Sequence, residues 1–205
     1  MQNGISFVVL GCIFLIIFLI IGILSLQNEK YLLKFDIPIL LILHRMNSKR
    51  IISVCKFFSS LGSIPTIIGI SIVLILICLI EERLSYIPYI LINNLLLGIG
   101  SNFLIKLIFR RRRPRGKKLV RATNTSFPSG HTMSTLICYS TLFFLLNQSI
   151  GDGLISLILS IAVFCLIILI AISRVILRVH YPSDILGGLS LGLFLVSITN
   201  FLFLV

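Results

Sequence analysis

The stretch from Ser173 to Asp184, which reads SRVILRVHYPSD, places ionisable side chains between two long hydrophobic runs. Arg174 precedes His180 by six residues, and Asp184 follows the histidine by four. A carboxylate one helical turn after a histidine can accept the imidazole N–H, which leaves the other ring nitrogen as an outward lone pair. His180 is therefore a candidate nucleophile or base. This spacing alone is equally compatible with a hydrogen-bonded structural pair.

A second cluster, FPSGH from Phe127 to His131, comes directly before another hydrophobic run. The start of a helix offers unpaired N–H groups and the positive end of the helix dipole, so it favours an anion. We predict Pro128 in the first helical turn, Ser129 as a hydroxyl donor and Gly130 as an amide that an anion can approach closely. His131 would then lie beside the anion. The cluster alone is also compatible with an ordinary helix start.

A third cluster, KLIFRRRRP, runs from Lys106 to Pro114. Lys106 and Arg113 are seven residues apart, and a helix would place both on one face, two turns apart. Pro114 would end that helix. We therefore predict that the two cations face one pocket.

Near the proposed pocket the clusters supply at least three fixed cations, together with two histidines and one carboxylate: Lys106, Arg113, Arg174, His131, His180 and Asp184. This charge balance suits a transferring phosphoryl group, whose charge is spread over its oxygens. A divalent metal is disfavoured, because Asp184 is the only acidic residue in the clusters and the cations would repel a metal. An acyl-hydrolase triad of Ser129, His180 and Asp184 is an alternative, but one oxyanion needs one or two donors and would leave the cations unexplained.

The composition determines which elements must position these residues. The chain of 205 residues is 58% hydrophobic and 12% charged, with a mean hydropathy of +1.14, which is typical of a membrane protein. We predict an all-α fold, a polytopic membrane helix bundle forming a single domain over residues 1–205. Runs of about 20 apolar residues match a hydrocarbon core of roughly 30 Å. Six transmembrane helices are expected at about residues 4–26, 57–80, 84–106, 131–150, 153–172 and 185–205.

Between the first and second spans the chain mixes charges with short apolar clusters. We predict short amphipathic helices in the headgroup layer there, interrupted at Pro38 and at Asn47–Ser48. The third predicted span carries Asn93, Asn94 and Asn102, which we interpret as polar contacts between helices in the bundle interior.

The net charge of +12 indicates nucleic acid, anionic lipid or a phosphorylated ligand as a partner. Nucleic acid is disfavoured, because the cations lie in loops between spans and not in a separate basic domain. We expect an anionic lipid in the membrane as the partner, and no protein partner is evident. All of the 18 lysines and arginines except Arg83 lie on one side of the predicted bundle. By the positive-inside rule that side would be cytoplasmic.

At the three clusters the chain resembles the type 2 phosphatidic acid phosphatase family, whose motifs read K-x6-R-P, P-S-G-H and S-R-x5-H-x3-D. All three motifs are matched without substitution, in order and in spacing. The six-span layout also resembles the family's bacterial membrane branch. The resemblance implies a lipid phosphatase that hydrolyses a terminal phosphate from a lipid phosphate or diphosphate. Phosphatidylglycerophosphate, phosphatidic acid and undecaprenyl diphosphate are the substrates that it suggests.

The resemblance also implies a role for each motif residue. His180 would attack phosphorus and become a phosphohistidine, Asp184 would orient it, and His131 would protonate the leaving group. The phosphoryl oxygens would be held by Lys106, Arg113, Ser129, Gly130 and Arg174. Water would then hydrolyse the intermediate, and no metal or other cofactor is implied.

The resemblance implies an active site on the extracytoplasmic face, with both termini in the cytoplasm, whereas the loop charges predict the reverse. We follow the resemblance on this point. Two alternatives to hydrolysis use the same site. In a headgroup or phosphate transferase an acceptor other than water meets the phosphohistidine, and in a non-catalytic lipid phosphate binding or transport protein the cations only recognise the phosphate.

Seven further basic residues between positions 110 and 121 lie outside the motifs: Arg110, Arg111, Arg112, Arg115, Lys117, Lys118 and Arg121. We expect them in a loop that is solvated or bound to lipid headgroups. A sharper hypothesis is that they gather an anionic lipid headgroup over the site.

Overall fold

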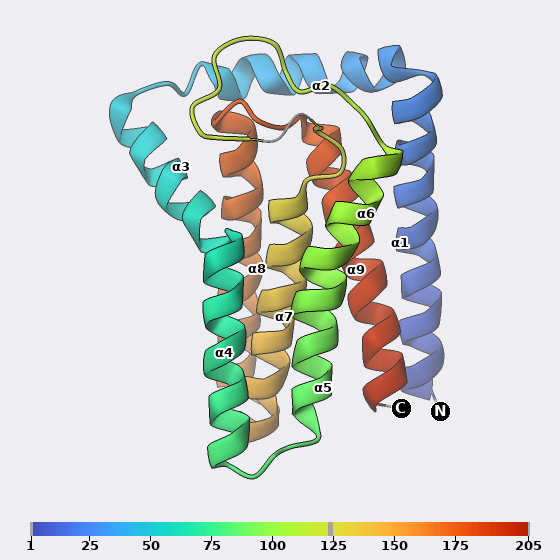
Figure 1. Cartoon of the computed structure of the whole chain (residues 1–205), viewed down its shortest axis with the longest axis vertical. Helices are drawn as coiled ribbons and strands as arrows, with labels where there is room; N and C mark the ends of the chain where they lie inside the picture. Colours follow the sequence, from blue (N-terminus) through green and yellow to red (C-terminus); the bar gives the residue numbers. More distant parts are fainter. Residues whose placement is uncertain (1, 123–124, 205) are drawn as a thin grey trace.

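The computed structural model describes residues 2–122 and 125–204. Long helices stand side by side in a bundle, and α1 begins at the same end at which α9 finishes (Figure 1). In chain order the helices are α1 (Gln2–Gln27), α2 (Glu29–His44), α3 (Lys49–Leu61), α4 (Ile64–Ile80), α5 (Tyr86–Ile90), the π-helix η1 (Leu91–Gly100), α6 (Ser101–Ile108), α7 (Gly130–Ile150), α8 (Leu154–Ile176) and α9 (Pro182–Leu204).

Five helical runs are long and apolar enough to cross a membrane: Ile5–Gln27, Tyr86–Ile108, Gly130–Ile150, Leu154–Ile176 and Pro182–Phe203. Helices α3 and α4 together make a sixth candidate span, bent by 45°. The predicted all-α membrane bundle is therefore confirmed. The last two spans extend beyond their predicted limits, so that Arg174 and Asp184 lie within α8 and α9 and not in the connecting loop.

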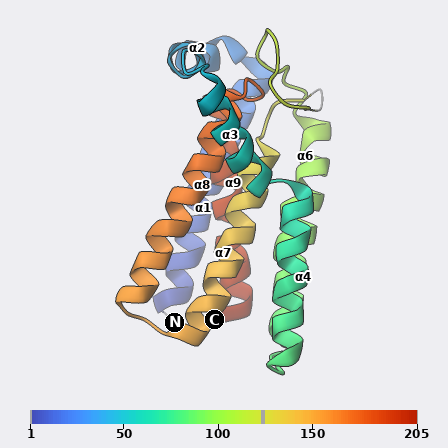
Figure 2. The same ribbon diagram turned by 90° about the vertical axis from the view of Figure 1, so that its left-hand side faces the viewer.

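The second span differs from the predicted helix over 57–80, because the chain breaks at Gly62 and Ser63 (Figure 2). Pro65 in the first turn of α4 has no N–H to continue the hydrogen-bond ladder of α3. Gly62 lies close against the bundle. A Cβ atom at this position would meet the Thr135 hydroxyl and would come within 2.8 Å of Ile170 Cγ2. The bend therefore brings α3 and α4 into close contact with α7 and α8.

Helix α2 runs across the end of the bundle opposite the two chain ends (Figures 1 and 2). The predicted break at Pro38 is wrong, because α2 continues through this residue although a proline removes one helical hydrogen bond. The predicted break at Asn47–Ser48 is confirmed: Ser48 is the N-cap of α3, and its Oγ accepts a hydrogen bond from the Ile51 N–H at 3.3 Å.

The third span is irregular, since its middle is the π-helix η1. Asn93 and Asn94 are fully buried in η1, and the Asn94 side-chain amide donates a 2.9 Å hydrogen bond to Ser71 Oγ of α4. The interpretation of Asn94 as a polar contact between helices is confirmed.

Three phenylalanines pack together where the loop between α6 and α7 meets the first span. Phe109 and Phe127, at the two ends of this loop, pack against each other with ring centroids 5.1 Å apart. Both also contact Phe18 of α1, each at 5.8 Å between centroids. This apolar contact fixes both ends of the loop against the bundle.

The close packing at Gly62 gives a test of the bend. We expect Gly62→Ala to lower stability by roughly 1–3 kcal/mol, because the added methyl group must displace Ile170 or Thr135. Gly69→Ala on α4 is the matched control, since a Cβ there meets nothing within 4 Å. Thermal unfolding in detergent micelles would check this. An equal or higher midpoint for Gly62→Ala than for Gly69→Ala would contradict the packing described.

Candidate active site

The chain leaves the helical conformation just before the arginine run. Helix α6 ends at Ile108, and Phe109 adopts an extended conformation with φ −94° and ψ 98°. Arg112 then forms an isolated antiparallel β-bridge with Thr125. The prediction that Lys106 and Arg113 share one helical face is therefore wrong, because the residues between them do not form a continuous helix.

In this extended segment, buried and exposed arginines alternate along the chain. Successive side chains of an extended segment point to opposite sides. Accordingly Arg111 and Arg113 are buried, with 4% and 8% of their surface exposed, whereas Arg110 and Arg112 are exposed. The expectation of a solvated loop is therefore wrong for Arg111.

A cavity of about 500 Å³ lies at this end of the bundle. Six of the eight predicted site residues line it: Lys106, Arg113, Gly130, His131, Arg174 and His180. The three sequence motifs, far apart in the chain, thus meet at one cavity. Although the chain after Ile108 is extended and not helical, both Lys106 and Arg113 line this cavity. The other two predicted residues, Ser129 and Asp184, are fully buried next to this lining.

His180 lies between α8 and α9, two residues before the first residue of α9. Its Nε2 atom is 3.2 Å from Arg113 Nη1, on the side of the cavity. Its Nδ1 atom is 3.5 Å from Asp184 Oδ2, which is longer than an ordinary hydrogen bond. Burial lowers the pKa of His180 to about 4. The nearby Asp184 acts to raise this pKa, whereas Arg113 and Arg174 lower it further. At neutral pH the ring is therefore uncharged and carries a lone pair.

Asp184 lies in the first turn of α9, where the helix dipole favours a carboxylate. Its Oδ2 accepts hydrogen bonds from the Tyr181 N–H, at 2.8 Å, and from the Ser126 hydroxyl. Its Oδ1 accepts a 2.7 Å hydrogen bond from Arg111. The carboxylate is therefore fixed on both of its oxygens. His180 itself is not helical, so its contact with Asp184 joins the first turn of α9 to the segment between α8 and α9.

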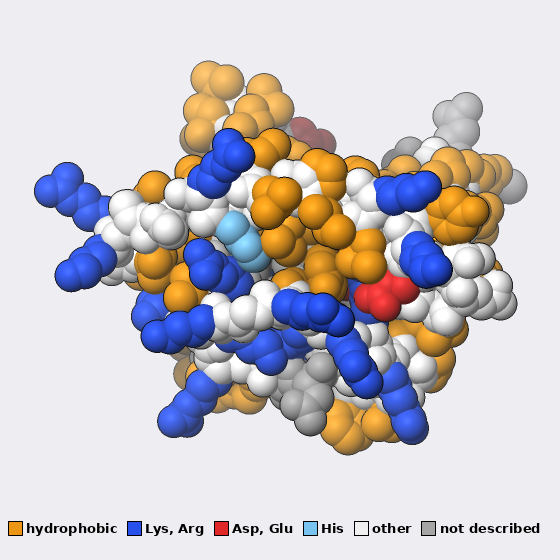
Figure 3. All heavy atoms as spheres, turned by 90° about the horizontal axis from the view of Figure 1, so that it is seen from above, with side chains coloured by type: hydrophobic (Ala, Val, Ile, Leu, Met, Phe, Trp, Pro, Cys, Tyr) orange, Lys and Arg blue, Asp and Glu red, His pale blue; other side chains and the backbone are white. Residues whose placement is uncertain are grey.

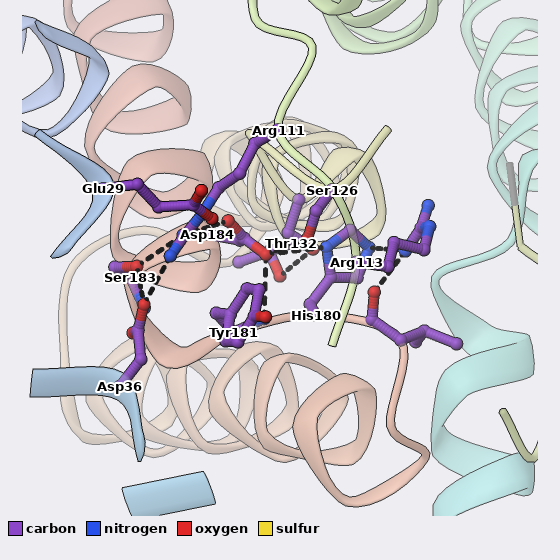
Figure 4. A network of polar contacts seen from close by, with 12 residues as sticks. Glu29, Asp36, Arg111, Arg113, Ser126, Thr132, His180, Tyr181, Ser183 and Asp184 are labelled. Atoms are coloured by element: carbon purple, nitrogen blue, oxygen red, sulfur yellow. Dashed lines mark hydrogen bonds and ion pairs between the residues drawn. The ribbon is translucent and has the colours of Figure 1, made fainter. Parts of the chain in front are cut away.

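Arg111 is the centre of a buried ionic network (Figure 4). Besides Asp184, its guanidinium contacts Asp36 through Nη2 at 2.7 Å and Glu29 through Nε at 3.3 Å, both from α2. The Tyr181 ring lies beneath it, 4.3 Å from the guanidinium carbon to the ring centroid. Burial alone would lower the pKa of Arg111, but Asp184 and Asp36 outweigh it and raise the pKa above its usual value.

Helix α7 begins at Gly130, one residue before the predicted span of 131–150. Ser129 is its N-cap and Gly130 its first residue, so the prediction of Pro128 in the first turn is wrong. The Ser129 N–H donates to the Asp184 carbonyl at 3.0 Å, and its Oγ accepts from the Thr132 hydroxyl at 2.9 Å. These contacts join the start of α7 to the start of α9.

Gly130 packs tightly against Asn102 of α6. A Cβ at position 130 would come within 2.6 Å of Asn102 Cγ, so only glycine fits without displacement of that side chain. Asn102 also lines the cavity. From the sequence this asparagine was expected only as a contact between helices, and its place at the site, one helical turn before Lys106, was not predicted.

Arg174 lies in the last turn of α8, with 3% of its surface exposed. Its Nη1 donates to the Ser59 hydroxyl of α3, a neutral partner. Its Nε has no hydrogen-bond partner among the described residues. Two neighbours in the cavity lining, Arg121 and Thr125, come from the loop before α7 and were not predicted as site residues.

The family model of the PAP2 superfamily matches residues 83–203, a region that contains all three motifs. The chain belongs to the PAP2 superfamily. The family predicted from the motifs is thereby confirmed.

Individual PAP2 proteins are similar to the chain in sequence and in fold. Phosphatidylglycerophosphatase B of Bacillus subtilis (strain 168) is 35% identical over 106 residues, which are 49% of this chain and 52% of that protein. The match thus spans about half the length of this curated relative.

The crystal structure of a transmembrane PAP2-type phosphatidylglycerolphosphate phosphatase from Bacillus subtilis superposes with a TM-score of 0.71 at 25% identity, over 98% of this chain and 95% of that chain. The structure of LpxE from Aquifex aeolicus, at 21% identity and a TM-score of 0.63 over 80% of this chain and 94% of that one, shares the fold. The chain is a multi-pass membrane protein with the PAP2 fold.

Proposed function

We propose that this protein is an integral membrane lipid phosphatase that removes a terminal phosphate from a lipid phosphate or diphosphate. The observation that carries the proposal is the convergence of the three motifs on one cavity, to which they contribute two histidines and three cations. Catalysis of phosphoryl transfer is largely positioning and electrostatic stabilisation, and this lining provides both.

The reaction begins with His180. Its Nε2 lone pair attacks phosphorus, and the bond from phosphorus to the lipid oxygen breaks while His131 donates a proton to that oxygen. Asp184 stabilises the positive charge that develops on the imidazole. Water then attacks the phosphohistidine, the P–N bond breaks, and His131 takes up the proton of the water. Inorganic phosphate is released with His180 restored.

Positive charge is arranged around the phosphorus. Arg113 lies 3.2 Å from His180 Nε2, so its guanidinium is already next to the atom that attacks. Lys106 and Arg174 come from two other sides of the cavity, from α6 and α8. With the Gly130 amide and the Ser129 hydroxyl they hold the three equatorial oxygens. In our proposal the site needs no metal ion.

The cavity lining supports a lipid substrate. Apolar side chains adjoin the polar end, namely Ile64, Ile99, Phe103 and Leu107. A phosphate headgroup can therefore lie among the cations while the apolar part of the lipid contacts the helices. Phosphatidylglycerophosphate is the leading candidate, because the Bacillus subtilis relative and the Bacillus subtilis structure described above are both named as phosphatases of this lipid. Phosphatidic acid and undecaprenyl diphosphate are the other candidates.

We further propose that the site opens on the extracytoplasmic face. The site lies at the end of the bundle opposite the start of α1 and the end of α9 (Figure 1), which agrees with termini in the cytoplasm in the predicted topology. Lysine and arginine side chains are abundant on this end (Figure 3). Anionic lipid headgroups would hold these side chains at the interface.

His180 provides the main test of catalysis. Purified protein should release phosphate from a lipid phosphate panel, and His180→Ala should lower kcat by at least roughly 10³-fold, because it removes the nucleophile. A chelator should leave the wild-type rate unchanged. His44→Ala is the matched control, since His44 lies on α2 and bonds the Val175 carbonyl instead of lining the cavity.

Several outcomes would contradict the proposal. Lipid binding without turnover would favour a binding or transport protein, and transfer to an added alcohol acceptor without phosphate release would favour a transferase. Full activity of His180→Ala would exclude the phosphohistidine.

The basic loop provides a second test. Arg115, Lys117 and Lys118 are exposed, and if they gather anionic headgroups, neutralising all three should raise KM for an anionic lipid phosphate by roughly tenfold. Hydrolysis of a small soluble phosphate ester should not change. Arg83→Gln, at the other end of the bundle, controls for loss of charge. Equal effects on both substrates would contradict headgroup capture.

Sidedness can be measured by labelling. In a variant without the native cysteines, a cysteine at Lys117 should react with an impermeant maleimide added to intact cells. A cysteine at Glu82, in the connection between α4 and α5, should react only after the cells are opened. The reverse pattern would place the site in the cytoplasm.

A further inference from the structure

The contacts of Arg111 connect the candidate catalytic pair to the helix that crosses the bundle end. One nitrogen, Nη1, contacts Asp184 Oδ1 and the Ser183 hydroxyl, each at 2.7 Å. The other terminal nitrogen, Nη2, contacts Asp36 of α2 at 2.7 Å. Arg111, Asp36 and Asp184 have side chains that are 0% exposed. This bridge joins residues that are more than 70 positions apart in the chain.

Asp36 also binds the start of α9 directly. Its Oδ1 accepts the Ser183 N–H at 2.7 Å and its Oδ2 accepts the Ser183 hydroxyl at 2.6 Å. Ser183 is the residue immediately before Asp184. The carboxylate of α2 therefore fixes both Arg111 and the first turn of α9.

We propose that Arg111 is a positioning residue for the reaction, which holds the Asp184 carboxylate toward His180, and that Asp36 makes α2 a structural part of the active site. The inference rests on the proposed phosphatase function. Arg111 acts through Asp184, because the cavity lining formed by the described residues does not include Arg111. Its role is thus distinct from that of Arg113 two positions later.

The two oxygens of the Asp184 carboxylate have different partners, and this explains how Arg111 can hold Asp184 toward His180. Arg111 takes Oδ1, which leaves Oδ2 within 3.5 Å of His180 Nδ1 and bonded to the Tyr181 N–H. Without the guanidinium, two buried carboxylates would lie near each other with no cation between them. Asp184 would then turn away or take up a proton, and His180 would lose the acceptor that orients its ring.

The geometry requires an arginine. A guanidinium presents donors in a fixed planar fork and can bond two carboxylates at once, whereas a lysine ammonium is a single point charge. The flat face of Arg111 also stacks on the Tyr181 ring. Lysine at position 111 should therefore restore part of the function of an alanine variant, but not all of it.

The test compares Arg111→Ala with Arg110→Ala and Arg112→Ala, which remove the same charge from exposed neighbours in the same segment. With a lipid phosphate as substrate, Arg111→Ala should lower kcat by roughly 10–100-fold, the effect typical of a lost supporting contact. KM should stay within about twofold, because the residue does not line the cavity. Arg111→Lys should recover part of kcat, and both neighbour variants should keep the kcat of the wild type.

Asp36→Asn separates positioning from folding. This isosteric change should lower kcat less than Arg111→Ala does, because the asparagine oxygen can still accept a hydrogen bond from Ser183. The double variant should be slowed by less than the product of the two single effects, because both residues hold Asp184 and the start of α9 in one network. Thermal unfolding of each variant reports the folded fraction to which kcat is normalised. If Arg111→Ala does not fold, lowered kcat in Arg111→Lys and Asp36→Asn supports the inference, and unchanged kcat in both overturns it.

Other outcomes distinguish a failure of the positioning role from a failure of the proposed function. Equal kcat for Arg111→Ala and Arg112→Ala, or a change in KM alone, would overturn the positioning role while the phosphatase function stands. An inactive wild type would instead overturn the proposed function.

Discussion

The paired burial of Arg111 with Asp184 and Asp36 is the constraint on which the rest of the site depends. A buried ion pair is weak evidence for stability, but removal of one partner costs roughly 3–5 kcal/mol, because an unpaired charge remains inside the protein. The α6–α7 loop, α2 and the start of α9 therefore cannot move apart separately. The position of His180, two residues before α9, follows from the same constraint.

The Arg111 network also affects the positive charge of the cavity lining. The chain has 6 acidic residues, and Glu29, Asp36 and Asp184 all contact Arg111. Arg174, by contrast, pairs with the neutral hydroxyl of Ser59. The cations of the cavity lining thus keep a strong attraction for an anion from outside the protein, as a phosphate site requires.

Much of this arrangement could be predicted from the sequence, and the failures have physical causes. Spans follow from hydropathy and length, and the motif spacing identified the residues that meet at the cavity. The route of the chain after Ile108 could not be predicted, because the four consecutive arginines, 110–113, show no hydrophobic periodicity that separates helix from extended chain. The role of Asp36 depends on a contact 75 residues away in sequence. Its spacing of four from the buried Leu32 on α2 was the one available signal.

The Arg111 network and the cavity lining form two sides of the site that have different functions. The Arg111 network contains residues of α2, the α6–α7 loop and the α9 start, all closely bonded. On the other side, the cavity lining comes from the α3–α4 bend, η1, α6, α7, the loop before α7, the last turn of α8 and His180. Leu107 and Phe103 on that side are exposed where lipid would lie. A rigid ionic side can hold the nucleophile while an apolar side admits lipids of different shapes, because the substrate contacts are separate from the contacts that orient His180.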